Sequence, residues 1–196
     1  RKVKFFDTYS SDKEIVIPSY YVIPKSEGKI IENLKRNQIK FKELQSDSLI
    51  TVESYKIVDF KTVKNPYEGH YLHFDTQVSS ELKTKKFRKG DYLVSTKQEG
   101  VKFLLETLEP EAVDSYFNWN EFDGILGQKE YFSDYVFEDT AAELLKTNKA
   151  LKTALELKKA SDVKFAEDGA AQLDWVYKNS EYYEGTVNQY PIYRIR

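Results

Sequence analysis

The chain has 196 residues, and its 30 Lys or Arg and 32 Asp or Glu residues give a net charge of −2. A surface with this balance lacks the basic excess that binding to duplex nucleic acid or to an anionic membrane requires. The absence of cysteine excludes disulfides, thiolate zinc sites and cysteine nucleophiles. Because every apolar run falls far short of the ~20 residues of a membrane helix, we expect neither nucleic acid binding nor membrane insertion.

The chain begins with Arg1 and contains no methionine. Because a natural open reading frame begins with methionine, we expect this sequence to be a fragment of a longer protein. At about 150 residues per domain, its length corresponds to one large domain or two small ones.

The N-terminal part reads as short strands interrupted by a helix. β-branched and aromatic runs, punctuated by polar residues and prolines, predict strands at residues 2–9, 14–17 and 20–23. A helix is predicted over 27–37, because its apolar residues share one helical face and Ser26 can cap its first turn.

Alternating apolar and polar residues predict longer strands next. The first covers 49–63 and changes its buried face near Ser54, which indicates a bulge. The alternation at 70–78 predicts a strand that pairs with a second one at 81–87, and 91–96 forms one more strand.

After residue 97 the apolar period changes from two to 3.6. It predicts helices at 101–108, at 141–146 after a capping box formed by Thr140 and Glu143, at 149–158, and in a segment that Ser161 caps. A final strand returns at 190–195. We therefore expect an α+β fold: a mostly antiparallel sheet, arranged as a sandwich or partly open barrel, with helices packed at one side or end.

No linker separates the two halves. We expect one accessory domain over residues 1–196, with a β-rich part at 1–97 and a helix-rich part at 98–196.

The only histidines are His70 and His73. Side chains three positions apart on a strand point to opposite faces, and zinc sites in proteins use three or four protein ligands. The sequence therefore predicts no metal site and no cofactor in this chain. We expect one histidine to be packed and the other to be solvated beside Asp75, and keep both only as additional candidate site residues.

Carboxylates gather around Pro110, where Glu109, Glu111 and Asp114 lie close together. Acid–base catalysis needs a pair held in one cleft with divergent pKa values, and we interpret these residues as charges at a helix end. The chain has no Gly-rich phosphate loop, no Gly-x-Ser-x-Gly turn and no His-Glu-x-x-His helix. The sequence thus predicts no catalytic residue.

Aromatic residues alternate with Asn, Asp and Glu over 116–123 and again over 131–138. Surfaces that bind sugars or peptides have this composition, because rings supply contact area at low entropic cost and polar groups fix orientation. A core beneath loops has it as well, and both interpretations remain open. The candidate interface or ligand-binding residues are Trp119, Asn120, Asp123, Tyr131, Asp134 and Tyr135.

Several segments together resemble a known family. They are FRKGDYLV at 87–94, LEPEAVDS at 108–115, WNEFD at 119–123, QKEYFSDYVFED at 128–139, QLDWVYKNS at 172–180 and YPIYR at 190–194. Their order and spacing, from residue 67 onward, resemble the region after the catalytic domain in Bacteroidetes zinc carboxypeptidase-like proteins of the carboxypeptidase A-type family.

The resemblance implies a peptidase domain upstream of Arg1, with this chain as its non-catalytic C-terminal accessory domain. Members of the family bind zinc through His-x-x-Glu and a distant third His, but here His73 follows His70 at that spacing. No catalytic or metal-binding residue is therefore carried over, and zinc is expected only in the upstream domain. The resemblance also implies a secreted or periplasmic protein.

Two hypotheses follow for the role of the chain. In the first, it docks on the peptidase domain of the same polypeptide or shapes its substrate cleft, with residues 119–139 as the contact surface. In the alternative, it is a binding module in its own right, in which exposed aromatic residues such as Trp119, Tyr131 and Tyr135 contact a peptide or a cell-wall glycan.

Overall fold

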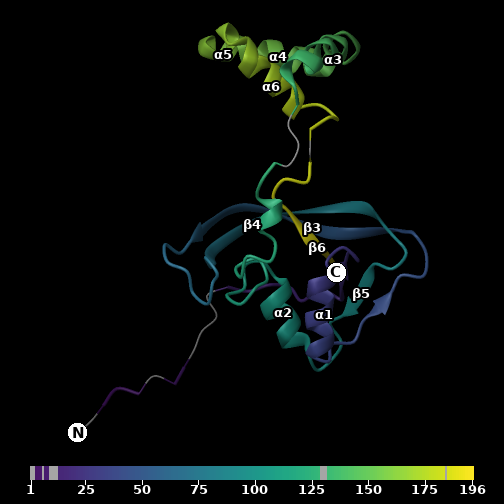
Figure 1. The fold of residues 1–196 in the computed structure, drawn as a ribbon, viewed down its shortest axis with the longest axis vertical. Helices are drawn as coiled ribbons and strands as arrows, with labels where there is room; N and C mark the ends of the chain where they lie inside the picture. The colour runs from purple at the N-terminus through teal and green to yellow at the C-terminus, as the bar shows by residue number, and fades with distance from the viewer. Residues whose placement is uncertain (1–2, 6, 9–12, 129–131, 184) are drawn as a thin grey trace. The chain divides into compact units, whose positions relative to one another are not determined.

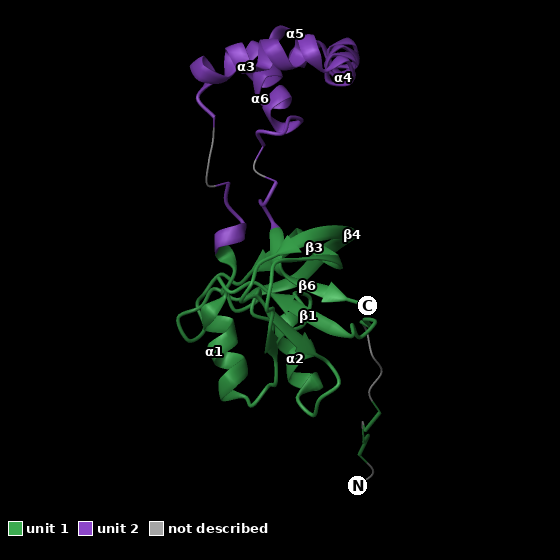
Figure 2. Cartoon of the chain, turned by 90° about the vertical axis from the view of Figure 1, so that its right-hand side faces the viewer, with its two compact units in different colours: residues 1–123, 189–196 green, residues 124–188 purple. Residues whose placement is uncertain are grey.

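The computed structural model describes residues 3–5, 7–8, 13–128, 132–183 and 185–196 (Figure 1). The chain forms two compact units, which Figure 2 distinguishes by colour. Unit 1 consists of residues 1–123 and 189–196, and unit 2 of residues 124–188. The helix-rich part expected from residue 98 is thereby divided, since residues 98–123 belong with the sheet.

Unit 1 is built on one open sheet. In the described part of the chain its strands are β1 (Tyr20–Ile23), β2 (Lys42–Glu43), β3 (Ser48–Thr62), β4 (His73–Phe87), β5 (Tyr92–Ser95) and β6 (Gln189–Ile195). They follow the order β2-β5-β1-β6-β3-β4, and every pair is antiparallel. The expected α+β fold with a mostly antiparallel sheet is confirmed.

The last strand occupies the middle of this sheet. β6 pairs with β1 on one side and with β3 on the other, as expected for a strand that returns at the end of the chain. The strand predicted at 14–17 is wrong, because these residues lie in an irregular arm that leads into β1. The described residues between 3 and 8 also form no strand.

β3 and β4 form a long hairpin of two strands with 15 residues each. The prediction that 70–78 pairs with 81–87 is wrong. Ser79 and Ser80 do not turn the chain but pair with Lys56 and Tyr55, so that both predicted segments lie on one continuous strand.

Two irregularities change which residues the hairpin buries. The register of β3 against β6 shifts between Ser54 and Lys56, which confirms the bulge expected near Ser54. On β4, Asp75 has a φ of 52° and the register shifts near it. His73 and Thr76 are both buried as a result, although strict alternation places them on opposite faces.

Two helices belong to unit 1, and they lie on the same side of the sheet in Figures 1 and 2. α1 (Gly28–Arg36) buries Ile30, Ile31 and Leu34 as its periodicity predicts. α2 (Val101–Leu108) buries Leu104 and Leu108. The predicted cap at Ser26 is wrong, because its hydroxyl donates to Glu27 Oε1 at 2.8 Å instead of accepting from the helix.

Unit 2 contains α3 (Asp134–Thr147), α4 (Lys149–Ser161), α5 (Val163–Glu167) and α6 (Gly169–Lys178). A short 3-10 turn, η1, covers Asp123–Ile125. The core of unit 2 is apolar and consists of Phe137, Ala141, Leu151, Leu155, Val176 and Tyr177.

The helix boundaries of unit 2 differ from two predictions. α3 starts at Asp134, so Thr140 and Glu143 lie inside it and form no capping box. The segment after α4 is capped by Asp162, whose carboxylate accepts from the backbone N–H of Phe165, and not by Ser161. Asn148 and Asp168 cap α4 and α6 in the same way, which satisfies backbone donors that have no partner within the helix.

We predict that Leu104→Ala destabilises unit 1 by about 2–5 kcal/mol, because the side chain is fully buried and its removal leaves a cavity. Urea denaturation checks this value. Leu82→Ala is the matched control, since Leu82 is 67% exposed and its truncation is expected to cost less than about 1 kcal/mol. Equal losses for both variants would contradict the assignment of the core.

Candidate functional site

The structure brings most of the candidate residues of unit 1 together. His70, His73, Trp119, Asn120 and Asp123 lie around the end of the β3–β4 hairpin and the loop of residues 109–123. Asp134 and Tyr135 belong to unit 2, where they form the first turn of α3. Tyr131 lies outside the described residues.

His73 holds this region together from inside. Its Nδ1 lies 2.9 Å from Thr62 Oγ1, and its Nε2 lies 3.0 Å from Asp123 Oδ1 and 3.2 Å from Asn120 Nδ2. A proton on Nε2 donates to the carboxylate and leaves Nδ1 to accept from the Thr62 hydroxyl. Because both ring nitrogens have partners, this arrangement supports a structural role for His73.

Aromatic side chains gather on the surface beside His73. We call Tyr67, His70, Tyr71 and Trp119 the aromatic patch. The indole of Trp119 packs edge-on against His70 at 5.5 Å and against Tyr67 at 6.3 Å between ring centroids. Tyr67 and Tyr71 are 57% and 52% exposed, so half of their surface is available for contact.

A tight turn and a polar contact shape the aromatic patch. Tyr67 and His70 exchange two backbone hydrogen bonds of 2.8 and 2.9 Å, while Glu68 and Gly69 adopt φ values of 49° and 84°. The Asn120 amide donates to the Tyr71 carbonyl at 2.8 Å. Glycine at 69 is the sequence signal for this turn, and it could have identified Tyr67 as a site residue.

The loop that carries Trp119 is fixed by buried polar residues. Ser115 Oγ donates to the Pro110 carbonyl at 3.1 Å, and the Asn118 amide donates to the Ala112 carbonyl at 2.8 Å. Thr76 Oγ1 on β4 donates to Asn118 Oδ1 at 2.8 Å. Because these groups are buried and paired, the loop is a rigid support for the aromatic patch.

A buried ionic network lies behind this loop. Arg194 on β6 contacts two carboxylates: its Nη1 donates to Glu53 Oε2 at 2.8 Å, and its Nε lies 3.1 Å from Glu109 Oε1 in an ion pair without hydrogen-bond geometry. Tyr21 donates to Glu109 Oε1 at 2.5 Å, and Arg194 also donates to the hydroxyl of Tyr55. Glu109 is therefore not the solvated helix-end charge expected from the sequence.

The two carboxyls of the network have opposite pKa shifts. Burial raises the pKa of Glu109 above its ordinary value of 4.5, against the opposing effects of Tyr21 and Arg194. Burial also acts to raise the pKa of Glu53, but the guanidinium groups of Arg196 and Arg194 outweigh it and hold that pKa below 4.5. Glu53 thus provides the more firmly ionised partner of Arg194.

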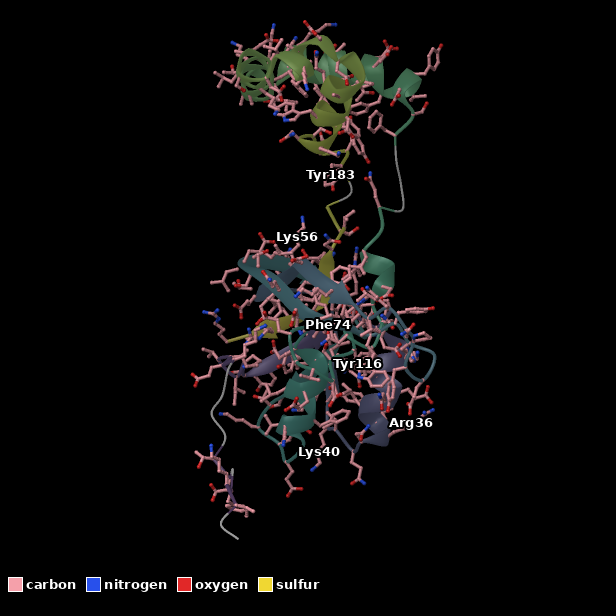
Figure 3. The ribbon with its side chains drawn as sticks, turned by 90° about the vertical axis from the view of Figure 1, so that its left-hand side faces the viewer. Arg36, Lys40, Lys56, Phe74, Tyr116 and Tyr183 are labelled. Carbon is pink, nitrogen blue, oxygen red and sulfur yellow. The ribbon has the colours of Figure 1, made fainter. Side chains whose placement is uncertain are left out.

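A cavity of about 600 Å³ opens next to Glu109. Its walls come from β4, from α2 with the loop of residues 109–123, and from the arm before β1. Phe74, labelled in Figure 3, contributes one apolar wall. Asn118 and several acidic residues contribute polar and charged groups, so the cavity combines apolar and charged surface.

The part of the chain that the structure describes contains no group of three or more His, Cys, Asp or Glu residues that could hold a metal ion. The nearest approach to one is His73 with Asp123, whose contacts are satisfied by protein atoms. No helix in the described ranges is long and apolar enough to cross a membrane.

Comparison with known proteins finds sequence similarity to two fungal carboxypeptidases. Carboxypeptidase 2 of Trichophyton tonsurans and Carboxypeptidase 2 of Trichophyton equinum are each 31% identical to the chain over 101 residues. The match covers 50% of this chain, which spans only 18% of the length of these curated relatives. No family model and no solved structure matches the chain. The similarity indicates a carboxypeptidase-related region.

We predict that Arg194→Met destabilises unit 1 by about 3–5 kcal/mol, because it leaves the buried Glu109 without its cation and Glu53 with Arg196 alone. Arg196→Met is the control: it removes a cation that contacts Glu53 from a side chain that is 58% exposed, and is expected to cost about 1 kcal/mol or less. Urea denaturation measures both variants, and a smaller loss for Arg194→Met than for Arg196→Met would contradict the network.

We also predict a pH dependence from Glu53. A carboxyl whose pKa is lower in the folded state stabilises the fold above its unfolded pKa, and this contribution is lost as the pH falls through the folded pKa. The stability of the wild type relative to Glu53→Gln should therefore be constant above pH 4.5 and shrink below it. Urea denaturation from about pH 6 to about pH 3 tests this, and a difference that does not change with pH would refute it.

Proposed function

We propose that the chain is a non-catalytic accessory region of a carboxypeptidase-like protein, and that unit 1 docks on the peptidase domain of the same polypeptide. The observation that carries this proposal is the 31% identity to part of two proteins named Carboxypeptidase 2, of which the chain spans 18%. A region that corresponds to so small a share of a peptidase is suited to supporting a neighbouring domain.

The aromatic patch is the proposed contact surface. Interfaces are enriched in Tyr and Trp, and their energetic centres are rigid aromatic side chains surrounded by polar groups. Trp119 stands on a loop fixed by Asn118 and Ser115, and Asn120 and Asp123 supply polar atoms beside it. Little conformational entropy remains to be lost when such a surface is covered.

We further propose that a zinc ion lies in the peptidase domain and that the protein is exported to the periplasm or the medium of a Bacteroidetes bacterium, as the resemblance of the segments between residues 87 and 194 to zinc carboxypeptidase-like proteins implies. Both statements concern the longer protein. This chain contributes no zinc ligand in the proposal, since both ring nitrogens of His73 contact protein atoms.

The alternative function is binding of a peptide or a cell-wall glycan at the same surface. Trp119 is partly exposed, and the polar side chains of Asn120 and Asp123 lie next to it, an arrangement that suits stacking of a sugar ring with hydrogen bonds at its edge. Titration with soluble glycan or peptide fragments would then change the fluorescence of the wild type but not that of Trp119→Phe.

In the longer natural protein, we expect Tyr67→Ser with Trp119→Ala to lower the thermal midpoint of peptidase inactivation by a few degrees, which corresponds to about 1–2 kcal/mol of lost interface. The exposed Leu157 of α4, 67% accessible in unit 2 and outside residues 119–139, provides the control Leu157→Ser, which should leave the midpoint unchanged.

The double variant must also be measured in the isolated chain, to separate docking from the stability of unit 1 itself. A drop of the same size in the isolated chain, or an unchanged midpoint in the longer protein, would refute docking through the aromatic patch. A glycan or peptide that quenches Trp119 fluorescence in the isolated chain, without any effect of the double variant on peptidase inactivation, would instead support the alternative.

A further inference from the structure

The cavity beside Glu109 has a chemistry that the docking proposal does not use. Its lining includes four acidic side chains, Asp75, Glu106, Glu109 and Glu111, together with Lys13 and the imidazole of His73. Neighbouring cations already compensate two of the four, since Lys61 pairs with Asp75 at 2.7 Å and Arg194 pairs with Glu109. The remaining carboxylates, Glu106 and Glu111, make the cavity a site for a cation.

Lys13 shows how a cation is accommodated there. Its ammonium group donates to Glu111 Oε1 at 2.7 Å and to the Thr76 carbonyl at 3.3 Å. These two acceptors come from different walls, the loop of residues 109–123 and β4. The cavity therefore already binds a primary ammonium group between a carboxylate and a backbone carbonyl.

The backbone around Lys13 makes an extended segment the natural ligand. Residues 13–17 have no helix or strand, and Lys13 and Ile15 both line the cavity while Glu14 does not. Alternate residues of an extended chain share one face, so a lysine and the second residue after it enter together. Phe74 and Leu105 offer apolar surface to that second residue.

The arm of residues 13–17 is attached to unit 1 where Arg194 donates to the Val16 carbonyl, while its side chains are largely exposed. Ile15, Val16 and Ile17 are 38%, 71% and 55% exposed, and the Lys13–Glu111 pair is itself partly exposed. Ion pairs of this kind contribute about 0–1 kcal/mol. Segments with few buried contacts open at low free-energy cost.

We propose that this cavity is a binding site for an extended peptide segment with the pattern Lys-x-Ile or Lys-x-Val, and that residues 13–17 occupy it as an intramolecular competitor. The lysine ammonium binds Glu111 and the Thr76 carbonyl, and the apolar residue packs beside Phe74. The cavity and the aromatic patch differ in the ligand chemistry that they suit. The cavity binds a cation with an apolar neighbour, whereas the aromatic patch presents aromatic rings.

The test is a titration of the 196-residue chain with the peptide acetyl-Lys-Glu-Ile-Val-Ile-amide, followed by calorimetry. We expect Lys13→Ala to bind the peptide up to about fivefold more tightly than the wild type, because the competing ion pair that is removed contributes at most about 1 kcal/mol. In the Lys13→Ala background, Glu111→Gln should weaken binding by a similar factor of up to about five, since the ammonium loses its carboxylate.

Two controls make the outcome specific. The same peptide with norleucine in place of lysine keeps the apolar stem without the charge, and should bind up to about fivefold more weakly to Lys13→Ala. Glu81→Gln, which removes an exposed carboxylate that pairs with Lys83 far from the cavity, should leave the affinity of Lys13→Ala unchanged. Thermal unfolding of each variant checks that it is folded.

The proposal is overturned if folded Lys13→Ala does not bind the lysine peptide at millimolar concentration, if the norleucine peptide binds equally well, or if Glu111→Gln leaves the affinity unchanged. The titration contains no peptidase domain and uses no residue of the aromatic patch. Its failure would therefore leave the docking proposal standing, and failure of docking would leave this one standing.

Discussion

Arg194 is the side chain on which the architecture of unit 1 depends. It is 4% exposed, and a buried guanidinium is tolerated only where carboxylates and further acceptors surround it. Its partners come from three other parts of the unit: Glu53 from β3, Glu109 from the end of α2, and the carbonyl of Val16 from the arm before β1. Because Arg194 lies on β6, the chain must return from unit 2 before these groups can be satisfied. The central strand and the central charge are thus completed together, by the last residues of the chain.

The buried position of Glu109 fixes the start of the loop of residues 109–123, which leads to the surface. The carboxylate is held in the network, and the residues that follow it form a loop whose own polar groups are paired inside, Ser115 with Pro110 and Asn118 with Ala112 and Thr76. Trp119 and Asn120 come next, at the point where the loop reaches the solvent. The cavity and the aromatic patch therefore use two faces of one rigid loop, and each is anchored to the sheet through buried hydrogen bonds instead of through flexible contacts.

The spacing of apolar residues in the sequence was sufficient to predict those helices and strands in which this spacing is regular throughout. α1, α2 and β6 lie where periodicity predicts them, because their buried residues recur at helical or strand spacing. The predictions were wrong where a residue type is common in turns but can also continue a strand. Ser79 and Ser80 are common in turns, yet in β4 they continue a ladder because β3 offers them partners. Asp134 starts a helix before an aromatic run that lacks clear polarity, and its inward residues, Phe137 and Ala141, are defined only by packing against α4 and α6.

The candidate site shows the same limit at longer range. The sequence placed Trp119, Asn120 and Asp123 in one stretch, but their meeting with His73 requires a contact between residues 50 positions apart, and it depends on the displaced backbone at Asp75 that turns His73 inward. Glu109 was misjudged for a related reason: a carboxylate at a helix end is ordinarily solvated, and only the arrival of Arg194 from the far end of the chain makes its burial possible. The arrangement of the candidate site in unit 1 thus depends on ion pairs between residues far apart in the sequence, which local sequence patterns do not reveal. The same pairing explains why the cavity can hold a lysine. Arg194 pairs with Glu109, and Glu111 remains as the carboxylate that binds the lysine ammonium group.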